Sequence, residues 1–282
     1  MDNQTKLTTF AQRRLLYVAS GLVLIMGVIL FFLSDHTETF FSWTIGVPLT
    51  AAFLGSGYLA SFVLEFLAAR EALWVRSRIA VPAVLSFTSL TFIVTMIHLD
   101  KFHLDSDNPI TITITWAWIL VYALVPIIMS IIYIQQLRSA GDPSPVIAPL
   151  PVWFKGVLIG LGGLMMLLGI GFLIMPTELM SLWAWDQTAL TARAIGAWLV
   201  GIGMTAVHCV LENDWTRIQS VMIAYVLFGG LQLINLLRYP DAGGLDWSAL
   251  NTWIYFGFVI VILLAGLYGT WQSKKHLSAQ NQ

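Results

Sequence analysis

Long uninterrupted runs of apolar residues alternate with short polar segments along the whole chain. Eight of these runs have about the length, roughly 20 residues at 1.5 Å of rise each, that a helix needs to cross about 30 Å of hydrocarbon. They extend over Leu15–Leu33, Pro48–Ala69, Ile79–Leu99, Ile112–Tyr133, Val152–Met175, Ala189–Leu211, Ile218–Leu237 and Trp253–Trp271. The pattern predicts an all-α fold, a polytopic transmembrane helical bundle of eight crossings.

The last four runs repeat the sequence pattern of the first four. Between positions 55 and 100, a constant shift of 141 gives nine identities in 46 gapless positions. Shared hydrophobicity would align leucine and valine, whereas rarer residues carry this match. They pair Gly55 with Gly196, Glu71 with Glu212, Trp74 with Trp215, Arg76 with Arg217, and Asp100 with Asp241. Flanking matches pair Thr37, Glu38 and Trp43 with Thr177, Glu178 and Trp183 at a shift of 140, and Thr115 and Trp116 with Thr252 and Trp253 at a shift of 137.

This internal duplication predicts the domain organisation. Residues 1–140 form a first four-helix repeat, residues 141–152 a cytoplasmic linker, and residues 153–282 a second four-helix repeat. Because each repeat has an even number of crossings, both begin on the same side of the membrane. We therefore expect parallel repeats related by a pseudo-two-fold axis along the membrane normal.

Composition and charge agree with a membrane location. Hydrophobic residues are 58% of the chain and charged residues 10%, against about a quarter charged in soluble domains. With the N-terminus placed in the cytoplasm, eleven of the 14 Lys and Arg residues lie on the cytoplasmic side. This bias predicts cytoplasmic N- and C-termini in a bacterial-type inner membrane or plasma membrane, with the lipid bilayer as partner. A net charge of −1 without a basic patch argues against nucleic-acid binding.

Aromatic and acidic side chains are expected to gather at the outer interface around Arg193. An arginine among indoles and carboxylates could orient a zwitterionic or cationic ligand by charge pairing and cation–π contact. The alternative is that the tryptophans are ordinary interfacial residues and that Arg193 pairs with Asp186 or Asp241. The candidate ligand-binding residues are Arg193, Trp183, Trp185, Asp186, Asp100, Asp241, Trp116 and Trp253.

Two further ionisable side chains lie within the apolar runs. Glu65 is in the inner third of the second run and His208 near the inner end of the sixth. Charged groups in hydrocarbon are costly, so both are candidates for an intramembrane proton relay. Neither has an ionisable counterpart in the other repeat, and Glu65 could instead reach the interface near Arg70.

The repeated Glu-x-x-Trp-x-Arg motif lies in a short cytoplasmic loop of each repeat. Its residues are Glu71, Trp74, Arg76, Glu212, Trp215 and Arg217. One interpretation makes the tryptophans interfacial belt residues, the arginines contacts for lipid phosphates, and the glutamates local caps. The other makes the two copies a symmetric cytoplasmic site for a partner or an anionic ligand.

The fifth run is rich in glycine and contains a Gly-x-x-x-Gly pair. Its glycines are Gly156, Gly160, Gly162, Gly163, Gly169 and Gly171. Such residues let another helix approach the backbone closely. The run therefore predicts tight packing within the bundle, and a protein partner or self-association through this helix is the alternative.

No spacing of residues in the chain matches a known catalytic, metal-binding or cofactor-binding motif, so we predict no catalytic residue, no metal and no cofactor. The leading functional hypothesis is a non-enzymatic binding protein or an accessory subunit of a larger assembly. An alternative is a small-solute or proton-coupled transporter with an outer-facing aromatic vestibule. A second alternative is an intramembrane enzyme acting on a lipid or quinone, with Asp100, Asp241 and His98 as its acid and base groups.

Overall fold

The computed structural model describes residues 5–280, and these form a helical bundle in which eight helices are long and apolar enough to cross a membrane. The crossing helices are α1 (Phe10–Phe32), α3 (Pro48–Arg70), the joined α4 (Trp74–Ser77), η2 (Arg78–Ala80) and α5 (Val81–Ile97), α6 (Pro109–Arg138), α7 (Val152–Ile174), α9 (Ala189–Glu212), α10 (Gln219–Arg238) and α11 (Leu250–Gln280). Each overlaps one of the eight apolar runs. The prediction of an eight-crossing helical bundle is confirmed, and the chain is an integral membrane protein.

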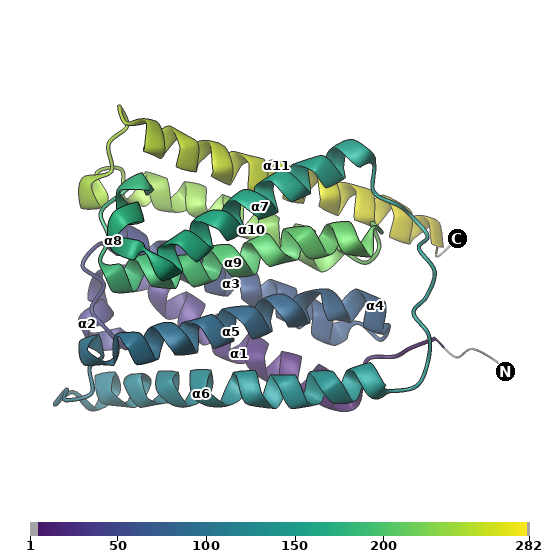
Figure 1. Ribbon diagram of the computed structural model, residues 1–282, viewed down its shortest axis with the longest axis horizontal. Coiled ribbons are helices and arrows are strands. Elements are labelled where there is room, and N and C mark those ends of the chain that lie inside the picture. Colours follow the sequence, from purple (N-terminus) through teal and green to yellow (C-terminus); the bar gives the residue numbers. More distant parts are fainter. Residues whose placement is uncertain (1–4, 281–282) are drawn as a thin grey trace.

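Short helical turns close the bundle at the end opposite the chain termini. They are η1 (Ser34–His36), α2 (Thr37–Phe40), η3 (Leu99–Lys101), α8 (Pro176–Leu179), η4 (Met180–Leu182) and η5 (Ala242–Gly244). Figure 1 shows α2 and α8 at this end, which we call the far end, and both labelled termini at the other, which we call the termini end.

Local sequence explains where several helices begin and end. The Thr9 side chain caps α1, Asn108 caps α6 ahead of Pro109, and Thr188 forms a capping box at the start of α9. Helix α9 ends at Glu212 and is followed by its C-cap Asn213, whose φ of 49° places it in the left-handed region that asparagine tolerates.

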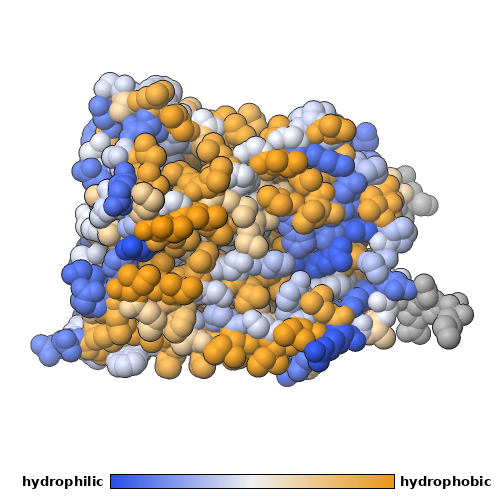
Figure 2. All heavy atoms as spheres, in the orientation of Figure 1, coloured by the Kyte–Doolittle hydropathy of each residue, from blue (hydrophilic) through white to orange (hydrophobic). Residues whose placement is uncertain are grey.

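Four helices form the interior of the bundle and four form its exterior. In α3, α5, α9 and α10, 56–67% of the apolar stretch is buried, against 17–33% in α1, α6, α7 and α11. The side chains exposed on the outer four helices are largely leucine, isoleucine and valine. Figure 2 shows this apolar surface between polar ends. In a bilayer the outer helices therefore contact lipid, while α3, α5, α9 and α10 form the core.

Helix pairing follows the same scheme in each half. Helix α1 packs on α3 and α7 on α9, while α3 packs on α10 and α9 on α5 across the two halves. Two glycines at matched positions allow the closest approaches, because a Cβ at Gly55 would lie 2.5 Å from Phe31 N and one at Gly196 2.7 Å from Gly169 O. These pairings are those expected of a parallel duplication, which itself stays a prediction, as do the repeat boundaries.

Candidate functional site

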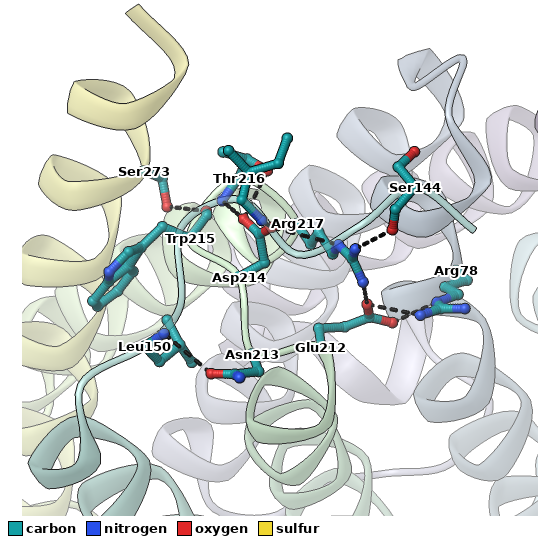
Figure 3. A network of polar contacts seen from close by, with 11 residues as sticks. Arg78, Ser144, Leu150, Glu212, Asn213, Asp214, Trp215, Thr216, Arg217 and Ser273 are labelled. Atoms are coloured by element: carbon teal, nitrogen blue, oxygen red, sulfur yellow. Dashed lines mark hydrogen bonds and ion pairs between the residues drawn. The ribbon is translucent and has the colours of Figure 1, made fainter. Parts of the chain in front are cut away.

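An extended polar network lies at the termini end and is centred on Glu212, the last residue of α9 (Figure 3). Its carboxylate accepts hydrogen bonds from Arg78 Nε at 2.5 Å and Arg78 Nη2 at 2.9 Å, and from Arg217 Nη1 at 3.1 Å. His208 Nε2 lies 3.3 Å from Glu212 Oε1. The Glu212 side chain is only 2% exposed, so its charge is compensated by these partners and not by water.

The same network ties the segment before α7 to the loop between α9 and α10. Arg217 Nη2 donates to Ser144 O at 2.6 Å, and Asp214 accepts a hydrogen bond from the backbone N–H of Ile147. Asp214 also accepts from both the N–H and the hydroxyl of Thr216. These hydrogen bonds hold the loop between α9 and α10 against the segment before α7.

Both motif tryptophans are buried, which overturns one interpretation of the repeated motif. Trp74 is 2% exposed and Trp215 3% exposed, so neither belongs to an interfacial belt. Arg217 is occupied by Glu212 and Ser144, not by lipid phosphate. The motif therefore shapes the interior of the protein, while a symmetric site for a partner stays a prediction.

The first copy of the motif has a weaker electrostatic environment than the second. Glu71 is half-buried, and burial raises the pKa of its carboxyl, against the opposing effect of Arg76 and Arg70. At the shift of 141, the position that matches Arg78 is Gln219, which carries no charge. A glutamate–arginine pair therefore joins the two halves at Glu212. For Glu71 the residue at the position that matches Arg78 is Gln219, which carries no guanidinium group.

Glu65 and His208, the two proton-relay candidates, lie in different surroundings and have different partners. Glu65 is fully buried, so it does not reach the interface near Arg70. Ser61 Oγ donates to its Oε1 at 2.8 Å, and Oε2 has no partner among residues 5–280. His208 belongs instead to the Glu212 network. The proton-relay role stays a prediction for both.

At the far end, Arg193 is paired with groups that differ from those expected. Its Nε donates to Leu173 O at 3.0 Å, and its Nη1 donates to His98 Nε2 at 2.8 Å. Within residues 5–280 no carboxylate lies within ion-pair distance of this guanidinium, so the expected pairing with Asp186 or Asp241 is wrong. Arg193 closes the end of α7 and joins it to the first half.

The other candidate ligand-binding residues do not gather around Arg193. Trp183 and Trp185 are buried 5.2 Å apart in an aromatic cluster with Tyr255. Trp116 and Trp253 are about half exposed on the outer helices. Asp186 and Asp241 are exposed, as is Asp100, which pairs with Lys101 at 2.9 Å. The predicted vestibule around Arg193 is therefore not assembled, although ligand binding by these residues individually stays a prediction.

A recess of about 330 Å³ does open at the far end, and of its lining residues sequence reasoning selected only His98, as a candidate acid or base group. The lining residues are Trp43, Thr44, His98, Lys101, Thr188, Ala189 and Leu190. Burial, followed by the Arg193 charge, lowers the pKa of His98. A neutral imidazole can accept the Arg193 hydrogen bond, which agrees with that direction.

Further polar side chains join the halves, and of these sequence reasoning selected only Trp185, as a candidate ligand-binding residue. Asn235 Nδ2 donates to Ser56 Oγ at 2.9 Å, Gln232 Nε2 to Phe53 O at 3.2 Å, and Trp185 Nε1 to Thr50 Oγ1 at 2.7 Å. The amide side chains of Gln232 and Asn235 could have indicated these contacts in the sequence, because uncharged polar side chains in a span form interhelical hydrogen bonds.

The cavity deep between the halves is small, while larger recesses between them, of about 170 Å³ and 330 Å³, lie at the far end. The deep cavity has a volume of about 50 Å³ and is lined chiefly by apolar residues of α3, α5, α9 and α10, with Ser61, Thr205 and Tyr225 as its polar members. Thr205 and Tyr225 bond to each other, their hydroxyl oxygens 2.8 Å apart. The interface is thus closed along most of its length.

The glycines of α7 divide between two faces. Gly162 and Gly169 pack against the backbone of α9, which confirms tight packing within the bundle. Space is open beside Gly156, Gly160 and Gly163 within the described part of the chain, so self-association through that face stays a prediction.

Within residues 5–280, no three His, Cys, Asp or Glu side chains gather closely enough to hold a metal ion. In comparisons with known proteins, no family model, no curated protein and no solved structure matches the chain.

Proposed function

We propose that this protein is a non-enzymatic binding protein of the membrane that serves as an accessory subunit of a larger assembly. The observation that supports this proposal is the closed interface between the halves. Charged and polar contacts span it at the termini end (Arg78 with Glu212), within the spans on the side of the far end (Asn235 with Ser56) and at the far end itself (Arg193 with His98).

A closed interface favours binding over alternating access. A transporter whose halves rock against each other must break the contacts between them in every cycle, and here these include buried charge-assisted hydrogen bonds. The cavity of about 50 Å³ among α3, α5, α9 and α10 is too small for most solutes, and the larger recesses between the halves, of about 170 Å³ and 330 Å³, lie at the far end. A rigid bundle with lipid-facing outer helices fits a scaffold that holds a partner or a membrane-soluble ligand.

Native mass spectrometry after gentle detergent extraction tests the proposal. We expect a protein or small molecule to remain bound at a fixed stoichiometry. Reconstitution in liposomes with solute-flux and pH-sensitive dyes is the companion measurement. Flux above that of protein-free liposomes would overturn the proposal.

Proton-coupled transport is the second candidate, favoured by one observation. Glu65 is buried with an unpartnered Oε2, and its partner Ser61 lines the central cavity. An unsatisfied buried carboxyl oxygen is costly and is a frequent mark of a proton-transfer site. Glu65→Gln would abolish coupled flux under this candidate, while Ser86→Ala, on the neighbouring α5, would serve as a control variant.

We also propose that the termini end faces the cytoplasm of a bacterial-type cell, as the distribution of Lys and Arg indicates. Cysteine labelling in intact cells tests this orientation, since the native Cys209 is buried. A membrane-impermeant maleimide should label Ser248→Cys, in an exposed segment at the far end, and should leave Lys275→Cys unlabelled until the cells are opened. The reverse pattern would invert the topology.

A further inference from the structure

The second half contains a cavity of about 130 Å³ that the proposed function does not by itself explain. It lies among α7, α9 and α11, with α10 and α3 behind it, and its lining is almost wholly apolar. Leu164, Leu182 and Ile254 line it and are each more than half exposed on the outside of the bundle. The cavity therefore opens sideways, toward lipid, in the half of the membrane nearer the far end.

The helices on either side of the cavity account for its position. Helices α7 and α11 touch near the termini end, where the Trp153 and Phe154 rings lie 5.2 Å and 5.5 Å from the Tyr268 ring. Toward the far end they diverge, as Figure 1 shows, and the short α8 and η4 lie at that end. The divergence leaves the space between Leu164 and Ile254.

The first half has no cavity of this size at the matched place because two tyrosines fill it. Tyr58 and Tyr122 are buried with their hydroxyl oxygens 2.5 Å apart, and the remaining cavity there is about 10 Å³. Under the repeat alignment, their matched positions are Leu199 and Val259, which both line the larger cavity. Two smaller side chains thus replace a pair of phenols.

The lining carries one unpartnered hydrogen-bond donor. Trp183 lines the cavity and is 7% exposed, and its indole N–H has no acceptor among residues 5–280. A buried donor without an acceptor is costly, so an acceptor supplied by a ligand would be favourable. Aromatic rings surround the same space, from Phe53, Phe228, Tyr255 and Phe258.

From this geometry we infer that the cavity binds the ring of a membrane-soluble molecule that carries a carbonyl group on a flat ring with an apolar tail, the chemistry of an isoprenoid quinone. A cavity of roughly 150 Å³ accepts a benzene ring, so this cavity of about 130 Å³ is near the size of a bare ring, and ring substituents and the tail must extend through the opening toward lipid. The aromatic walls favour a flat ring. Trp183 Nε1 is itself buried, so the indole must turn toward the ligand for its N–H to donate to the carbonyl oxygen. The inference rests on the proposed binding function and names its ligand class.

Binding of decylubiquinone to the protein in lipid nanodiscs tests this inference. The ligand should raise the unfolding temperature of the wild type in a saturable manner. Trp183→Phe keeps the ring and removes the N–H, so we expect a loss of affinity of about tenfold. Filling the cavity with Val259→Phe should also weaken binding.

Trp43→Phe is the matched control. Trp43 is the repeat counterpart of Trp183 and its indole N–H is likewise buried and unpartnered within the described chain. It borders the 10 Å³ cavity, which is too small for a ring, and the far-end recess, which is lined in part by Thr44, His98, Lys101 and Thr188 and lies at the end of the bundle, away from the lipid-facing opening beside Trp183. We expect its affinity for decylubiquinone to equal that of the wild type.

Three results would overturn the inference. They are an absence of saturable binding by folded wild-type protein, equal effects of the Trp43 and Trp183 substitutions, and equal binding of n-decanol, which has the tail without the ring. A retained protein partner in the mass spectrum would in those cases leave the proposed function standing. Conversely, saturable quinone binding together with solute flux would overturn the proposed function and keep the site.

Discussion

In both loops that carry the repeated motif, the tryptophan backbone N–H donates to the segment that precedes the first helix of its own half. Trp74 N donates to Lys6 O at 3.1 Å, and Trp215 N donates to Ala148 O at 2.9 Å. The acceptors are related by nearly the same shift along the chain as the tryptophans. The two loops therefore share a backbone arrangement although their surroundings differ in charge.

A second matched contact shows where the loops begin to differ. Thr8 N donates to the backbone oxygen of Ala72, whereas Leu150 N donates to the side-chain oxygen of Asn213. Asn213 adopts a left-handed conformation, and its side-chain Oδ1 is the acceptor. The same contact is thus made by backbone in one half and by a side chain in the other.

The two loops differ most in the charged side chains around their glutamates. Glu212 is surrounded by Arg78, Arg217 and His208, while Glu71 has a raised pKa and remains half-buried. The two loops share their backbone geometry, but only Glu212 has an arginine partner from the other half. The position that matches this partner, Arg78, is Gln219, which cannot form an ion pair. Shared backbone geometry in a repeat therefore does not preserve an ion pair.

The largest expected effect comes from removing the Glu212 charge. Glu212→Gln leaves two guanidinium groups without their carboxylate in a buried site and should lower the free energy of unfolding by about 3–5 kcal/mol. Glu71→Gln should cost less than about 1 kcal/mol. Reversible unfolding in mild detergent measures both, and equal losses would mean that the loops are electrostatically alike.

A smaller effect is expected for Arg78→Gln, which gives the first half the residue found at the matched position of the second. Glu212 keeps Arg217, so only the contact between the halves is lost. Because the Arg78 side chain is 30% exposed, we expect about 1–2 kcal/mol of destabilisation in the same assay. No change would show that Arg217 alone compensates Glu212.

The reciprocal change, Gln219→Arg, places a guanidinium at the position that matches Arg78 in the repeat alignment, where the predicted pseudo-two-fold relation would bring it near Glu71. A new pair with a half-buried carboxylate should stabilise the protein by about 0.2–1 kcal/mol. Gln219→Lys is the control, because an ammonium lacks the two-pronged geometry of arginine. Destabilisation by Gln219→Arg would contradict this expectation. It would show that the loop with Glu71 does not lie as close to α10 as the loop with Glu212 lies to η2.

The smallest effect concerns the far end and is a dependence on pH. The pKa of His98 is lowered in the folded protein, so below the ordinary histidine pKa of about 6.5 the unfolded chain binds a proton that the folded chain does not. Stability should therefore be fully present above that pH and decline as the pH falls below it. The unfolding temperature of His98→Gln should therefore fall less than that of the wild type as the pH is lowered below about 6.5.

Tyr239→Phe provides the matched control for His98, since Tyr239 occupies the equivalent position of the second repeat and carries no imidazole. It should keep the wild-type pH dependence. A decline that persists unchanged in His98→Gln would assign the effect to other groups, of which Asp100 and Lys101 are the nearest charges besides Arg193.

Much of the fold could be predicted because hydrophobic runs of the right length permit little else in a membrane. The far-end contacts could not, because partners such as Arg193 and His98 are far apart in the chain and neither lies in a motif. The burial of Trp74 and Trp215 also contradicts the usual preference of tryptophan for interfaces, since the preceding segments cover both loops. The Arg78 partner of Glu212 was missed because the residue is unmatched in the repeat.

The segment before α1 has a consequence for how the chain is made. Lys6 N donates to Asp142 O, and Lys6 O accepts from Trp74, so one residue near the start joins the first loop to the linker after α6. A ribosome must synthesise Asp142 before this contact can form. All four helices of the first half are therefore translated before its termini end can be closed, and a fusion that displaces Lys6 would be expected to delay or prevent that closure.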